Sequence, residues 1–116
     1  MRHSVFGRKF SRNTDERKRL FTGLVRELFV RDAIVTTVAK AKAVQPIVEK
    51  LITKAKKGSN VAMRDILAVL GDKALAIRLT EDAKTRFGSR NSGFTRIIKL
   101  GKRMSDASEM AKFSLI

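Results

Sequence analysis

The side chains of this sequence that are most able to bind a partner through charge are those of its lysines and arginines. There are 26 of them against 11 Asp and Glu, which gives a formal net charge of +15. The stretch from Lys84 to Arg103 holds seven cations and no acid, and residues 1–12 are equally free of acids. Such runs bind phosphate groups, and a surplus of this size calls for a polyanionic partner. The pattern therefore predicts a nucleic-acid-binding surface.

Catalytic and metal-binding chemistry has no comparable support. The sequence contains no cysteine, which excludes thiolate, Cys-based zinc and iron–sulfur sites. Its single histidine, His3, cannot build a His-based metal cluster. Neither GxxxxGK[ST] nor GxGxxG occurs, and the scattered acids form no pair with an obvious base. We therefore expect no enzyme activity, no cofactor, no metal and no small-molecule substrate.

Membrane insertion and secretion are also not indicated. No apolar run approaches the roughly 20 residues that span a bilayer. The first twelve residues, MRHSVFGRKFSR, lack the apolar segment of a secretory signal. We expect a cytoplasmic protein with no membrane partner.

The hydrophobic pattern predicts one α+β domain. A helix should begin after Asn13, with Glu16 in capping-box position. A strand at 33–38 follows, and then come helices at 40–57, 61–70 and 72–87, a loop at 88–93, and strands at 94–100 and 110–116. We expect a kink or a fresh start at Pro46 and helix N-caps at Asn60 and Asp72. This order predicts two layers, with helices packed on a short mixed sheet. We assign residues 1–13 to a basic N-terminal extension and 14–116 to the domain.

Apolar side chains are divided between core and surface. We predict that Ala111, Phe113 and Leu115 face the core, together with Phe21, Phe29 and Phe87. The simplest interpretation of Met63, Met104 and Met110 is core or gap filling. Phe6, Phe10 and Phe94 are instead candidates for stacking on unpaired bases.

Three stretches of the sequence resemble one known family. They are MRHSVFGRKFSRN at 1–13, TTVAKAKAVQPIVEKLITKAKKG at 36–58 and RFGSRNSGFTRIIKLGKRMSDASEMAKFSL at 86–115. The combination of an MRH…GRK…R start with a [GS]G[FY]TRI segment is similar to the bacterial large-subunit ribosomal protein family numbered seventeen, essentially end to end. The resemblance implies a structural constituent of the large ribosomal subunit. Such a protein binds 23S ribosomal RNA near the polypeptide exit region, beside other ribosomal proteins.

Charge and resemblance together give the candidate RNA-binding residues. Arg17 and Lys18 are among them because cations in the first turn of a helix oppose its dipole, so an external anion should compensate them. For Lys40 and Lys42 a solvated helix face is an equal alternative. We expect contacts mainly to phosphate. The full set is Arg2, His3, Arg8, Lys9, Arg12, Arg17, Lys18, Lys40, Lys42, Arg86, Arg90, Arg96, Lys102 and Arg103.

Two other functions compete with ribosomal RNA binding. A helix-turn-helix regulator of DNA would use the helices 61–70 and 72–87, but the second opens with Asp72 and carries Glu81 and Asp82, a poor face for a major groove. An RNA-modifying enzyme would need the metal ligands, nucleotide motif or base that the sequence lacks.

Overall fold

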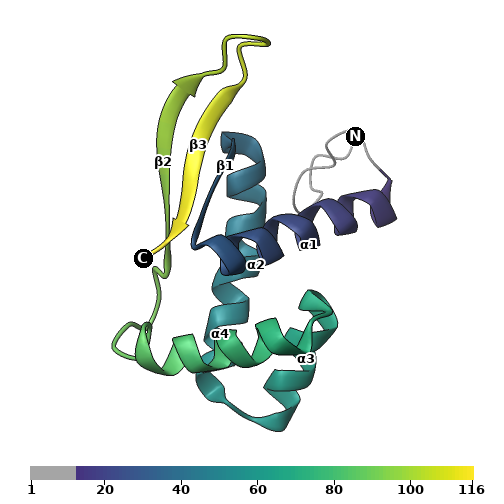
Figure 1. Ribbon diagram of the computed structural model, residues 1–116, viewed down its shortest axis with the longest axis vertical. Coiled ribbons are helices and arrows are strands. Elements are labelled where there is room, and N and C mark those ends of the chain that lie inside the picture. The colour runs from purple at the N-terminus through teal and green to yellow at the C-terminus, as the bar shows by residue number, and fades with distance from the viewer. Residues whose placement is uncertain (1–12) are drawn as a thin grey trace, which may run out of the picture.

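The structure is a computed structural model, and it describes residues 13–116. Helices and strands follow one another there in the predicted order (Figure 1). They are α1 (Thr14–Arg31), β1 (Ala33–Thr37), α2 (Val38–Lys57), α3 (Asn60–Leu70), α4 (Lys73–Thr85), β2 (Thr95–Lys102) and β3 (Glu109–Leu115). The predicted α+β class is confirmed. The expectations for residues 1–12, including Phe6 and Phe10, lie outside the described residues.

Side-chain caps fix where the helices begin. The Oδ1 atom of Asn13 accepts a hydrogen bond from the backbone N–H of Glu16 at 2.8 Å, as predicted for the start of α1. Asp72 caps α4 in the same way, through the N–H of Leu75 at 3.2 Å. Each cap satisfies a backbone donor that the first turn of a helix leaves without a partner.

Two helix starts differ from the prediction. The N-cap of α3 is Ser59, whose hydroxyl accepts from the N–H of Ala62 at 3.1 Å, so the prediction of Asn60 is wrong. The cause is Gly58, which ends α2 in the left-handed region and leaves Ser59 as the next extended residue. Helix α2 begins at Val38, with Thr37 as its N-cap, and it continues through Pro46. The fresh start that we expected at this proline therefore does not occur.

The sheet has the strand order β1-β3-β2, and both pairings are antiparallel. The prediction of a mixed sheet is therefore wrong. Strands β2 and β3 form a hairpin, which requires antiparallel pairing, and β3 then runs antiparallel to β1 as well. Figure 1 shows this long hairpin extending past the helices at one end of the molecule. The register shifts between Lys99 and Gly101, which marks a β-bulge at Leu100.

The core lies between the helices and one face of the sheet. Ala111, Phe113 and Leu115 of β3 are buried, as predicted, and so are Phe29 and Phe87. Partly buried residues pack around this core, and they include Phe21 and Met63. Alternation along β3 places its apolar residues against the helices.

Two predictions for apolar side chains are wrong. Phe94 is only 1% exposed, because its ring packs edge-on against Phe87 with 5.5 Å between ring centroids, so it cannot stack on a base. Met104 is fully exposed at the turn of the β2–β3 hairpin, beyond the reach of the helices, and fills no gap in the core.

Candidate nucleic-acid interface

Three of the predicted cations come together in one surface groove. Lys40 and Lys42 reach it from the first turns of α2, and Arg103 reaches it from the hairpin between β2 and β3. The groove is also lined by Thr37, Val38, Ala39, Ser108 and Glu109. Thr37 fixes the start of α2 by accepting the N–H of Lys40 at 3.3 Å. Cations far apart in the sequence thus form one basic site.

Arg103 is already paired within its turn. Its Nε and Nη2 atoms donate to the two carboxylate oxygens of Asp106 at 3.0 and 2.7 Å. The backbone N–H of Ser108 also donates to Asp106, at 3.1 Å. The hydrogen bond from Arg103 and then that from Ser108 hold the pKa of the Asp106 carboxyl far below its usual range, and the same pair raises the pKa of Arg103. The guanidinium is therefore held in one place, exposed at the groove.

The 88–93 loop is fixed to the helix layer by a lysine of α2. The Nζ atom of Lys56 donates to the backbone carbonyl of Arg90 and lies 5.3 Å from the centre of the Phe94 ring. Arg90 in turn donates from Nη1 to the carbonyl of Gly93 at 3.2 Å. The predicted RNA-binding residue Arg90 thus belongs to a loop with a defined conformation, although its side chain is exposed.

A carboxylate of α2 holds the other end of the same loop. Glu49 accepts from the backbone N–H of Phe94 at 3.2 Å and from the hydroxyl of Thr95 at 2.6 Å. The amide of Gln45 completes the network by donating to the Thr95 hydroxyl at 3.0 Å. Our sequence interpretation missed this role. The available signal was that Glu49 is the one acid in the cation-rich helix α2.

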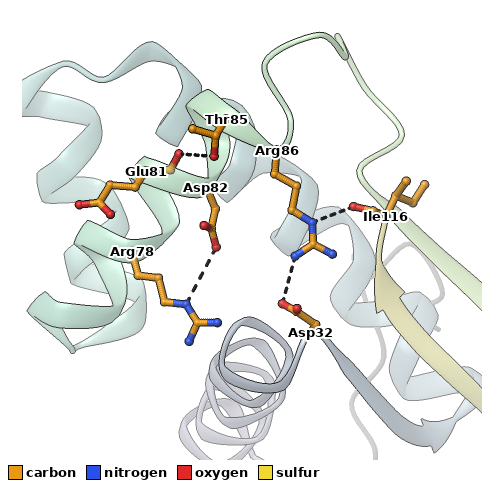
Figure 2. A network of polar contacts seen from close by, with 7 residues as sticks. All are labelled: Asp32, Arg78, Glu81, Asp82, Thr85, Arg86 and Ile116. Atoms are coloured by element: carbon orange, nitrogen blue, oxygen red, sulfur yellow. Dashed lines mark hydrogen bonds and ion pairs between the residues drawn. The ribbon is translucent and has the colours of Figure 1, made fainter.

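Arg86 is paired with two other groups of the protein (Figure 2). Its Nε donates to the carbonyl oxygen of Ile116 at 2.9 Å, and its Nη1 donates to Asp32 at 3.1 Å. Asp32 is the C-cap of α1 and has a φ of 66°, in the left-handed region. Arg86 therefore joins the end of α4 to the α1–β1 junction and to the residue that follows β3.

The other predicted cations lie outside the groove shared by Lys40 and Arg103. Arg17 is half-buried and Lys18 is exposed at the start of α1, and Lys18 lines a separate groove with Phe21. Arg96 and Lys102 are exposed on β2. The predicted residues Arg2, His3, Arg8, Lys9 and Arg12 fall outside the described part of the chain.

Metal-binding clusters and membrane-spanning helices are not found among residues 13–116. No group of three or more His, Cys, Asp or Glu side chains there is arranged to hold a metal ion. Within the same residues, no helix has both the length and the apolar character to cross a membrane.

Comparison with known proteins identifies the family. The model of the family described as ribosomal protein L17 matches residues 20–116. The chain belongs to this family. The large ribosomal subunit protein bL17 of Petrotoga mobilis is 40% identical and covers all of this chain and 97% of its own length. The bL17 proteins of Chlorobaculum parvum and Solibacter usitatus are each 44% identical over the whole chain, across 75% and 77% of their own lengths.

Family membership decides between the alternatives that the sequence left open. The chain is a structural ribosomal protein of the cytoplasmic ribosome and not an enzyme, so the alternatives of a DNA regulator and of an RNA-modifying enzyme are both set aside. The predicted family is confirmed.

Proposed function

We propose that this chain is a structural constituent of the large ribosomal subunit that binds and stabilises 23S ribosomal RNA. Its position is near the polypeptide exit region, in contact with neighbouring large-subunit proteins. The observation that carries the proposal is the groove where Lys40, Lys42 and Arg103 meet. The names of the bL17 relatives support the large subunit as the place of assembly.

Most contacts in this groove are to phosphate. Lysine ammonium groups are point charges without the geometry to read bases. The guanidinium of Arg103, whose Nε and Nη2 atoms are held by Asp106, offers Nη1 to a phosphate oxygen. The residues that line the groove include no aromatic ring on which a base could stack. Arg90, Arg96 and Lys102 are further exposed cations on the 88–93 loop and on β2.

The N-terminal extension is the second part of the interface. Residues 1–13 carry Arg2, His3, Arg8, Lys9 and Arg12 without any acid. We assign them to RNA binding, and residues 14–116 to the domain that positions them.

Binding to large-subunit RNA at several salt concentrations tests this function. Replacing Lys40 and Lys42 together by Gln should weaken binding and reduce the slope of log affinity against log salt by roughly 0.9 for each lost duplex phosphate contact. The matched control is Lys73→Gln, because Lys73 is an exposed lysine at the start of α4 that does not line the groove. A preference for duplex DNA over ribosomal RNA at equal salt would overturn the proposal, as would an unchanged slope.

A further inference from the structure

The sheet has a second face that no part of residues 13–116 buries. Alternation along β3 turns Lys112 away from the buried residues Ala111 and Phe113. The register places Lys112 between Val35 of β1 and Ile98 of β2, so these three side chains form one row across the sheet. Val35 is 63% exposed and Ile98 is 45% exposed.

A second row of side chains lies next to this one on the same face of the sheet. Ser114 of β3 pairs with Ala33 on one side and with Arg96 on the other. Arg96 and Lys112 are both exposed cations, and they lie on adjacent strands in diagonal positions. We call the surface of Val35, Arg96, Ile98, Lys112 and Ser114 the outer face.

The outer face carries positive charge without an opposing acid. Glu109 is the one acid in the three strands. Glu109 lies two residues before Ala111 in β3, so both side chains are on the same face of the sheet, opposite the outer face. Glu109 also lines the groove beside Lys40. Glu27 of α1 lines a groove with Val35, but it is paired with Arg31 at 2.6 Å. Within the sheet, the exposed aliphatic side chains of the outer face have only cations as charged neighbours, which favours a polyanion that also offers apolar surface.

We propose that the outer face binds the minor groove of an RNA helix. This inference rests on the proposed function and adds a second contact surface to it. The minor groove of A-form RNA is wide and shallow, displays riboses with their 2′-hydroxyls, and is bordered by two rows of phosphates. Val35 and Ile98 pack on the riboses, and Arg96 and Lys112 bind the phosphates.

Other occupants fit this face less well. A single strand would need aromatic side chains for base stacking, and the nearest rings, Phe94 and Phe113, are buried. A second copy of the chain would bring identical cations together in a protein of net charge +15. An acidic protein is the strongest alternative partner for this face, and crosslinking distinguishes it from RNA.

Salt-dependent binding to large-subunit RNA provides the first test. Lys112→Gln and Arg96→Gln should each lower the salt slope by about 1 and weaken binding, whereas Lys73→Gln should leave both unchanged. Melting temperatures like that of the starting protein would show that the exposed substitutions leave the fold intact. Slopes that stay unchanged in both variants would overturn the proposal.

Crosslinking inside assembled large subunits provides the second test. A benzophenone amino acid in place of Ile98 should crosslink to paired ribosomal RNA nucleotides. The control position is Val61, which is 62% exposed on α3, away from the sheet. Crosslinks from position 98 to a protein or to unpaired nucleotides would overturn the outer-face proposal. The absence of any crosslink from position 98 would overturn it as well. In that case the salt slopes of the Lys40 and Lys42 variants would still decide the proposed function independently.

Discussion

At the scale of single residues, Glu49 and Arg103 show that side chains can matter by holding other groups in place. Glu49 satisfies the N–H of Phe94 and the hydroxyl of Thr95, both in a buried part of β2 and its approach. Arg103 is held by Asp106 within a tight turn. Both interactions fix the backbone that carries exposed cations, so the basic surface is organised by contacts within the protein.

Glu49→Ala should lower the free energy of unfolding by about 1–3 kcal/mol, because it leaves two buried donors without an acceptor. Urea denaturation measures this change. Glu81→Ala removes an exposed carboxylate from α4 and should change stability by less than about 0.5 kcal/mol. Equal losses in the two variants would contradict the role of Glu49, and Glu49→Gln should restore part of the loss because it keeps one acceptor oxygen.

The turn around Asp106 should respond to acid in a defined direction. Its carboxyl pKa is lowered in the folded protein, so the stabilisation is complete above the ordinary aspartate pKa of about 3.9 and is lost as the pH falls through the folded value. A carbon-13 NMR titration of the carboxyl group should show Asp106 still ionised where other aspartates are protonated. Arg103→Gln should return the Asp106 midpoint toward the ordinary value. A normal midpoint in the unaltered protein would rule out the pairing in solution.

At the scale of elements, a glycine inside one helix and a glycine that follows another have opposite roles. Gly23 lies inside α1, and a Cβ atom added there would meet nothing within 4 Å. Gly88 follows α4, where an added Cβ would lie 2.5 Å from the carbonyl oxygen of Lys84. The same substitution should therefore act in opposite directions at the two positions.

Gly23→Ala should raise the free energy of unfolding by roughly 0.5–1 kcal/mol, because alanine has the better helix propensity. Gly88→Ala should lower it by about 1–3 kcal/mol, because the backbone must move to relieve the clash. Thermal and urea denaturation of the two variants side by side give the comparison. The same sign of change at both positions would show that close packing does not decide the effect.

Local features of the elements could be predicted from the sequence, and non-local ones could not. The Asn13–Glu16 cap and the buried alternation of β3 depend on neighbours within a few residues. The burial of Phe94 depends on Phe87 and on Glu49, which is 45 residues away in the sequence. The same limitation applies to the groove, since charge and resemblance identified Lys40 and Arg103 as candidates but did not show that they would meet.

At the scale of the whole molecule, Arg86 connects the helix layer to the sheet. Its guanidinium bridges Asp32 at the end of α1 and the carbonyl of Ile116 after β3 (Figure 2). Because both partners are protein groups, the main contribution of Arg86 is to tertiary structure. A direct contact between Arg86 and RNA phosphate is the competing interpretation.

Arg86→Ala should lower the free energy of unfolding by about 1 kcal/mol, a value suited to a partly exposed ion pair with an added hydrogen bond. The salt slope of RNA binding should stay the same. Arg86→Lys should recover only part of the stability, since one ammonium group cannot reproduce the two-sided geometry of the guanidinium. A reduced salt slope with unchanged stability would instead make Arg86 a direct phosphate contact.

The strand order β1-β3-β2 has a consequence for the synthesis of the protein. The middle strand is the last of the three to be translated, so β1 leaves the ribosome long before its hydrogen-bonding partner exists. Until β3 arrives, neither of the other strands has a neighbour in the sheet. The sheet therefore cannot be completed until β3 has left the ribosome, and a product truncated before β3 would expose unpaired strands to proteases and to aggregation. The topology thus makes the whole sheet depend on the last of its three strands.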